Sequence, residues 1–312
     1  MKREKTKMDK RVYGVIGVSS KMANWNADFS GYPRSLSDGT IFGSDKALKY
    51  PMRKMWDNEG KKVLYMKSMN FSKKNDTITL VPNSLKERYE KLFAVDDLKK
   101  CKDNKEVLTN LMTAVDVKNF GATFAEAKNN ISITGAVQFG QGINKYGDSD
   151  LETMQILSPF RDTKDAEAKN STIGTKKIIN EAHYFYPFSI NPSAYKELVA
   201  LGVTDGYTEE DYLNFKRTAL VAATSFSSNA KEGCQNEFAL FVETKLDTYL
   251  PNLSEYISFE KADINKIKIE CNMLNELEDI LNIEIYYNPE TTVLESNLEK
   301  AKIYNLITKK EV

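Results

Sequence analysis

Several kinds of residue are scarce in this chain of 312 residues, and each scarcity argues against a class of function. Histidine occurs once and cysteine three times at widely separated positions, which is too few for a zinc site or a disulfide framework. No stretch approaches the roughly 20 apolar residues of a membrane helix, and the charged N-terminus lacks an apolar signal core. We therefore expect a cytoplasmic protein with reduced thiols, no metal, no cofactor and no membrane contact.

Motifs of catalysis and nucleotide binding are also missing. The P-loop pattern does not occur, and Gly140 with Gly142 lacks the third glycine of a dinucleotide site. The one histidine, His183, lies in the aromatic segment EAHYFYPFS, a context typical of a structural histidine rather than a catalytic one. The sequence therefore favours a binding protein over an enzyme.

The charges balance overall but are unevenly distributed. Lysine and arginine total 44, as do aspartate and glutamate, which argues weakly against a nucleic-acid binder with a wholly basic surface. Residues 44–74 contain nine basic and three acidic residues, a net charge of +6, whereas residues 243–300 contain thirteen acidic residues and five lysines, a net charge of −8. This split indicates either a basic binding face with an acidic face elsewhere, or ordinary solvated surface.

The pattern of apolar residues predicts an α+β fold in one domain with insertions, because repeats, low-complexity tracts and linkers are missing. A long polar loop, residues 20–43, follows the first strand, and a helix begins after Ser44 with Pro51 inside it. Residues 159–174 have almost no apolar content and predict an exposed loop. The expected strands are 11–19, 62–68, 76–81, 131–141, 176–188, 237–243 and 283–287. One expected helix begins at residue 84, and three others span residues 97–113, 193–201 and 209–225.

One helix could bind an anionic chain. Lys46, Lys49 and Arg53 stand at positions i, i+3 and i+7, so their side chains form a row that could follow successive phosphates. A solvated helix face is the competing interpretation. The segment KNFGATF only partly matches an RNA-recognition motif, and the aromatic residues 184–188 fit core packing as well as base stacking.

Five segments, taken together and in order, resemble a known family. They are RVYGVIGVSS with NWNADFSGYPR; IFGSDKALKYPMRKMW; DVKNFGATFA with ISITGAVQFGQGINKY; LSPFR with HYFYPFSINP; and GYTEEDYLNFKRTAL with CQNEFALFVET. This set, over residues 11–245, resembles the backbone subunits of type I CRISPR interference complexes (Cascade), within the RAMP superfamily, and is most similar to the I-B branch. The chain beyond residue 247 does not align.

The resemblance implies a hand-like fold and a filament. A single RRM-like (ferredoxin-like) antiparallel sheet domain would span residues 1–312, with a helical fingers insertion at about 60–116 and a thumb hairpin at about 157–175. Copies would stack along the guide RNA beside other Cascade subunits, and the guide would pair with target DNA. A non-catalytic role is implied, because such a protein holds the RNA backbone while base pairing reads sequence.

The resemblance also implies RNA contacts. The expected ligands to phosphate or 2′-hydroxyl groups are Lys46, Lys49 and Arg53 on the helix, Asn24, Asn26 and Arg34 in the long loop, Gln138 and Gln141 on the strand leading to the thumb, and Arg161 at its base.

Two alternatives remain open at this level. In type III complexes a loop aspartate with a divalent metal cuts target RNA, and Asp28 lies in the corresponding loop. Alternatively, the chain is a protein-only scaffold whose +6 and −8 segments pair between copies.

Overall fold

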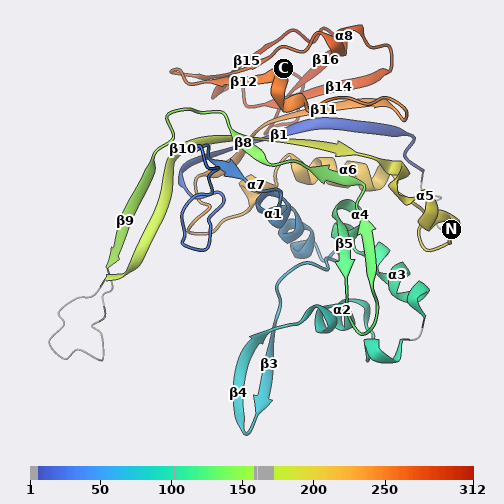
Figure 1. The fold of residues 1–312 in the computed structure, drawn as a ribbon. Helices are drawn as coiled ribbons and strands as arrows, with labels where there is room; N and C mark the ends of the chain where they lie inside the picture. The colour runs from blue at the N-terminus through green and yellow to red at the C-terminus, as the bar shows by residue number, and fades with distance from the viewer. Residues whose placement is uncertain (1–5, 102, 158–159, 161–171) are drawn as a thin grey trace.

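The computed structural model describes residues 6–101, 103–157, 160 and 172–312 of the chain (Figure 1). Its centre is a nine-stranded sheet in the order β16-β14-β11-β1-β10-β8-β2, with β7 and β9 also paired to β10. The strands are β1 (Lys10–Ala23), β2 (Phe42–Gly43), β7 (Val137–Phe139), β8 (Gly142–Asn144), β9 (Leu151–Leu157), β10 (Thr172–Ile190), β11 (Cys234–Lys245), β14 (Ile280–Tyr287) and β16 (Ala301–Asn305). The result is a mixed α/β fold dominated by one sheet.

The first strand occupies the middle of the sheet because both of its faces are buried. β1 pairs antiparallel with β10 on one side and with β11 on the other. Gly14 is required here, since a Cβ atom would overlap the carbonyl oxygen of Leu240 and the ring of Phe188. The predicted strand at 11–19 is confirmed and extends further at both ends.

Helices cover one face of the sheet and a second small sheet covers the other (Figure 1). The helical side holds α1 (Asp45–Asn58), α5 (Lys196–Ala200), α6 (Glu209–Ala219) and α7 (Ala222–Ser225), with the short turn η2 (Pro192–Tyr195). The opposite side holds β12 (Ile257–Glu260), β13 (Asn265–Ile269) and β15 (Thr292–Ser296), with η3 (Leu253–Tyr256) and α8 (Met273–Glu276). The sheet is therefore the shared wall of two apolar cores.

The helical core forms around two buried indoles. Trp56 of α1 donates its Nε1–H to Thr218 of α6 at 2.8 Å, and Trp25 donates to Tyr186 of β10 at 2.5 Å. Ser44 caps α1 as predicted, because its hydroxyl accepts the amide N–H of Ala47. α1 runs through Pro51 without a break.

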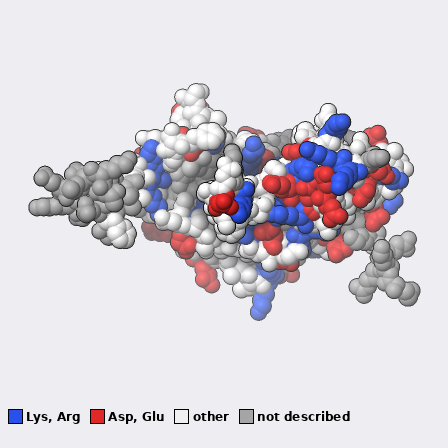
Figure 2. Space-filling model, turned by 90° about the horizontal axis from the view of Figure 1, so that it is seen from below, with Lys and Arg blue, Asp and Glu red and all other residues white. Residues whose placement is uncertain are grey.

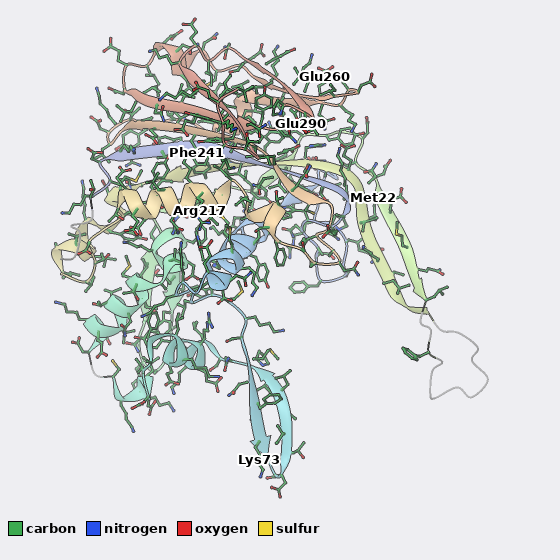
Figure 3. All side chains as sticks on the ribbon, turned by 180° about the vertical axis from the view of Figure 1, so that it is seen from behind. Met22, Lys73, Arg217, Phe241, Glu260 and Glu290 are labelled. Carbon is green, nitrogen blue, oxygen red and sulfur yellow. The ribbon has the colours of Figure 1, made fainter. Side chains whose placement is uncertain are left out.

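Along the chain, between the end of α1 and the start of β7, a separate insertion projects from the helical side of the sheet (Figure 1). It contains β3 (Met69–Lys74), β4 (Thr77–Pro82), α2 (Leu85–Phe93), η1 (Leu98–Lys100), α3 (Asn104–Thr113), α4 (Val115–Phe120), β5 (Gly121–Phe124) and β6 (Ile131–Thr134). β3 and β4 form an isolated hairpin, with Lys73 near its tip (Figure 3). β9 and the adjoining half of β10 form a second projecting hairpin.

Two secondary-structure predictions in this insertion are wrong. Residues 62–68 form an irregular segment with a bend at 64–66 instead of a strand, because the carboxylate of Asp116 accepts the backbone N–H groups of Leu64 and Tyr65 that a strand would use. The helix predicted over 97–113 is divided into η1 and α3, because Asp97 and Asp103 each cap a separate helix start. Capping boxes at Ser84 and Thr208 begin α2 and α6.

Candidate nucleic-acid interface

The long loop between β1 and α1 is held in place by two buried asparagines. Asn24 donates from Nδ2 to the carbonyl oxygens of Gly31 and Lys177, at 3.0 and 3.1 Å. Asn26 accepts both the amide and the hydroxyl of Ser44 on Oδ1, at 2.6 Å each. Both side chains are less than a tenth exposed, so their first role is to fix the loop. That Asn24 and Asn26 also contact RNA stays a prediction.

Three other predicted residues come from three parts of the chain: Arg34 from the same loop, Lys46 from α1, and Gln141 from the segment between β7 and β8. The backbone N–H of Arg34 donates to the carbonyl of Asn26, and Gln141 accepts the N–H of Asp45 on Oε1 at 3.3 Å. Lys46 is exposed in the first turn of α1. Gln141 and Lys46 therefore lie at the positive end of the helix dipole, where a phosphate is stabilised, beside the loop that carries Arg34.

The other two members of the predicted basic row are paired with carboxylates. Lys49 is 8% exposed and contacts Asp45 at 2.8 Å. Arg53 contacts the fully buried Asp116, with 3.4 Å between Nε and Oδ2. Burial lowers the pKa of the Arg53 guanidinium, although Asp116 opposes the change. A phosphate would have to compete with these carboxylates, and RNA contact by Lys49 and Arg53 stays a prediction.

Figure 2 shows this side of the molecule from below, with basic and acidic side chains intermixed over much of the face in view. Several lysines of the basic segment have acidic neighbours, as in the contacts Lys54–Asp57 at 3.4 Å and Lys61–Glu59 at 3.2 Å. Neighbouring carboxylates therefore partly neutralise the local charge of +6. Individual unpaired cations are for this reason more important for binding an anion than the net charge of the segment.

The last two predicted residues lie apart from this group. Gln138 donates to the carbonyl of Gly135 and lines a hollow of about 380 Å³ with Tyr13 and residues 250–253 of the C-terminal layer. Arg161 lies outside the described residues, as does most of the predicted loop at 159–174. The interface in the described chain therefore centres on the β1–α1 loop and the start of α1.

A larger hollow of about 450 Å³ opens between this loop and the root of the β9–β10 hairpin. The loop contributes Asp28, Tyr32 and Arg34 to its walls, and the hairpin root contributes Leu151 and Ile179. The hollow has a cation and an aromatic ring in its wall, which suits a nucleotide better than an apolar ligand.

Residues 10–286 match the sequence profile of the family described as CRISPR-associated protein Cas7. The chain belongs to this Cas7 family. Two solved structures resemble it over nearly all their length. One, a chain of a "CRISPR RNA-guided surveillance complex, pre-nicking", has a TM-score of 0.53 and 14% identity, covering 95% of this chain and 96% of its own. The other, from a "CRISPR RNA-guided surveillance complex", has a TM-score of 0.50 and 12% identity, covering 89% and 88%. No curated protein matches the chain.

Two lysines that hold the loop of this Cas7-family chain were not predicted from the sequence. Lys177 of β10 donates to the carbonyl of Ser30 at 2.9 Å, and its Nζ lies 3.1 Å from the centre of the Tyr32 ring. Lys231 donates to the carbonyls of Asn24 and Trp25, and burial lowers its pKa to about 8. No local pattern indicates either contact, because the partners are 147 to 207 residues apart.

Asp28, the residue of the enzymatic alternative, shapes the tip of the loop. Its Oδ1 atom accepts the backbone N–H groups of Ser30 and Tyr32, at 2.8 Å each. Within the part of the chain that the structure describes, no group of three or more histidine, cysteine, aspartate or glutamate residues is placed to hold a metal ion. The geometry therefore gives Asp28 a turn-forming role, and no observation favours metal-dependent cleavage.

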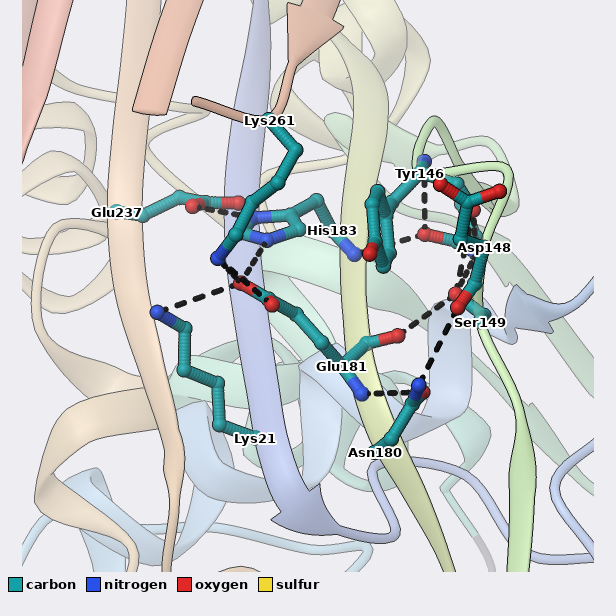
Figure 4. Close-up of polar contacts among 10 residues, drawn as sticks. Lys21, Tyr146, Asp148, Ser149, Asn180, Glu181, His183, Glu237 and Lys261 are labelled. Carbon is teal, nitrogen blue, oxygen red and sulfur yellow. Dashed lines mark hydrogen bonds and ion pairs between the residues drawn. The ribbon is translucent and has the colours of Figure 1, made fainter. Parts of the chain in front are cut away.

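The single histidine is the centre of a buried polar cluster (Figure 4). His183 is fully buried, with Nδ1 2.7 Å from Glu237 and Nε2 3.0 Å from Glu181, and its ring stacks on Phe259 at 3.7 Å. Burial alone would raise the pKa of Glu181, but hydrogen bonds from Lys261 and His183 lower it to about 2. Both ring nitrogens are engaged, which agrees with the predicted structural role.

None of the described helices is long and apolar enough to cross a membrane.

Proposed function

We propose that this Cas7-family chain is a guide-RNA-binding backbone subunit of a type I interference complex, of the I-B kind. Copies would assemble along the guide RNA in the cytoplasm, beside other Cascade subunits, and leave the guide free to pair with target DNA. The observation that carries the proposal is the family match over residues 10–286, supported by the likeness over 95% of the chain to a chain of an RNA-guided surveillance complex.

The strand order supports an RRM-like palm within this proposal. β1 lies between β11 and β10, and β10 is followed outward by β8, while α1 and α6 lie on the same face. A ferredoxin-like motif has this arrangement, with its first strand between its last and its third, and both helices on one side. In this assignment β1, the β7–β8 segment, β10 and β11 are the four strands of the motif.

We further propose that the two projecting parts are the fingers and the thumb. The insertion at about 60–116 would be the fingers, of which the structure describes the β3–β4 hairpin and helices α2 and α3. The thumb at about 157–175 would be the end of the β9–β10 hairpin, whose described part begins at Leu151. A thumb on a long antiparallel hairpin can reach a neighbouring copy without disturbing the central sheet.

The expected chemistry is recognition of the RNA backbone. Lys46 would neutralise a phosphate, and the positive end of the α1 dipole would favour the same anion. Arg34 would serve a second phosphate from the wall of the 450 Å³ hollow. Because these groups contact no base edge, one subunit can hold guides of any sequence.

Purification with and without ribonuclease tests the proposal. The protein, co-expressed with a guide RNA, should show a high ratio of absorbance at 260 to 280 nm and elute as large particles. Ribonuclease should lower the ratio and reduce the particles to monomers. Nucleic-acid-free monomers that also fail to bind added RNA would overturn the proposed function.

A further inference from the structure

One aromatic side chain in the β1–α1 loop is completely exposed. Phe29 has an exposed fraction of 105%, the largest among the big apolar side chains that the structure describes. Single exposed apolar residues are common and need no explanation. Phe29 differs because the loop that carries it is unusually well fixed and lies beside a hollow.

Phe29 lies in a turn that is closed by hydrogen bonds. Asp28 accepts the N–H groups of Ser30 and Tyr32 on its carboxylate, and its own N–H donates to the carbonyl of Tyr32 at 2.7 Å. Gly31 completes the turn with a φ of +81°, a conformation that side-chain-bearing residues rarely adopt. Lys177 then ties the turn to β10 through the carbonyl of Ser30. The ring of Phe29 is thus presented on a fixed backbone that loses little entropy when a ligand binds.

The surroundings of Phe29 supply a cation. Asp28 and Tyr32, which belong to the same turn as Phe29, line the 450 Å³ hollow, and Arg34 lines it as well. Among the described residues no carboxylate forms an ion pair with Arg34, in contrast to Lys49 and Arg53. An exposed aromatic ring on a fixed turn, with a hollow lined by an unpaired guanidinium under the same loop, supplies the stacking surface and the cation that bind single-stranded nucleic acid.

We propose that Phe29 stacks on a nucleobase of the bound RNA while Arg34 contacts an adjoining phosphate. The inference rests on the proposed function and adds a base-contacting residue to an interface otherwise made of backbone contacts. It is compatible with guides of any sequence, because every base presents a stacking face.

The inference can be tested with a tryptophan at position 29. The chain has two tryptophans, and Trp25 and Trp56 are 1% and 0% exposed. In Phe29→Trp the new indole is therefore the exposed one, and its emission should be quenched on titration with a mixed-sequence single-stranded RNA. Phe71→Trp, at a ring that is 72% exposed on the β3–β4 hairpin, is the matched control and should not be quenched.

Affinity supplies the second readout. Phe29→Ala should weaken RNA binding by about 5- to 160-fold, the range for loss of one stacked base. Its melting temperature should be unchanged, because the ring is fully exposed in the folded chain. The slope of affinity against salt should also be unchanged, since no charge is removed, whereas Arg34→Gln should lower that slope by about one.

The outcomes distinguish failure of the stacking proposal from failure of the proposed function. Wild-type affinity in Phe29→Ala, with no quenching of the Phe29→Trp variant, would overturn the stacking proposal and leave the proposed function standing. If the emission of Phe29→Trp were quenched in concentrated protein without RNA, position 29 would belong to a protein contact, which also overturns it. Failure of the wild-type protein itself to bind RNA would refute the proposed function first.

Discussion

The ion pair between Arg53 and Asp116 should be a main support of the insertion, and Asp116→Asn tests it. Asp116 is fully buried and accepts the N–H groups of Leu64 and Tyr65 at 2.8 and 2.9 Å, besides contacting Arg53. An asparagine has one acceptor oxygen, so its NH₂ group would face an N–H donor. The guanidinium of Arg53, 16% exposed, would lose its counter-charge.

The expected loss is large on the scale of protein stability. Removing one partner of a buried ion pair costs about 3–5 kcal/mol, against a total of about 5–15 kcal/mol for a typical domain. Urea denaturation, followed by the fluorescence of buried Trp56 on α1, would measure it. Asp205→Asn, at an exposed site, is the control and should stay within about 0.5 kcal/mol of wild type.

A double-mutant cycle sharpens the test and bears on RNA binding. In Arg53→Met with Asp116→Asn both charges are absent, so the double variant should lose less stability than the sum of the single variants. A loss below about 1 kcal/mol in Asp116→Asn would refute the structural role of the pair. If the Arg53→Met variant also lowered the salt dependence of RNA binding by about one, Arg53 would contact phosphate as well.

Three further predictions follow from neighbouring sites. Lys46→Gln should weaken RNA binding in a filter-binding assay and lower the slope of affinity against salt by about one. Lys49→Glu should instead lower the free energy of unfolding by more than about 1 kcal/mol, because the new carboxylate is buried beside Asp45. Glu181→Gln should lower the free energy of unfolding by about 1–2 kcal/mol at neutral pH, after allowance for solvent screening. The pKa of Glu181 in the folded chain, about 2, lies below the ordinary 4.5. The loss measured by urea denaturation should therefore be complete above pH 4.5 and vanish toward pH 2. Gly43→Ala should lower the melting temperature, at a cost of about 1–3 kcal/mol, because its methyl group would overlap the Tyr186 hydroxyl.

The sequence predicts those parts of the fold that depend on local chemistry. The strand around Val15, the cap at Ser44 and the capping boxes at Ser84 and Thr208 are recognisable because neighbouring residues in the chain decide them. The bend at 64–66 is not recognisable in this way, because Asp116, which holds it, lies 51 and 52 residues away from its partners.

In the candidate site, too, local features are predictable from the sequence and contacts between distant residues are not. Spacing on α1 predicts that Lys46, Lys49 and Arg53 form one row, and the resemblance names the other candidate contacts. Neither predicts that Asn26 and Gln141 bond to the start of α1. Periodicity cannot show that Arg53 is paired with a carboxylate from another element, since a row of cations has the same spacing whether it faces solvent or a buried acid. Distinguishing the two cases requires the tertiary structure.

The chain beyond the family match is integral to the fold. The match ends at residue 286, yet β15 pairs with β13 and β16 pairs with β14, so the last strands complete both sheets. The C-terminal layer also holds the root of the projecting hairpin. Lys261 contacts Glu181 of β10 at 2.8 Å, and Lys145, beyond β8, donates to the carbonyls of Ser254 and Ile257 at 2.6 Å each. Because β9 and β10 leave the sheet beside these contacts, the acidic C-terminal region fixes the direction in which the hairpin leaves the sheet. On the C-terminal side these contacts come from a lysine side chain and two backbone carbonyls, not from the acidic side chains of the region.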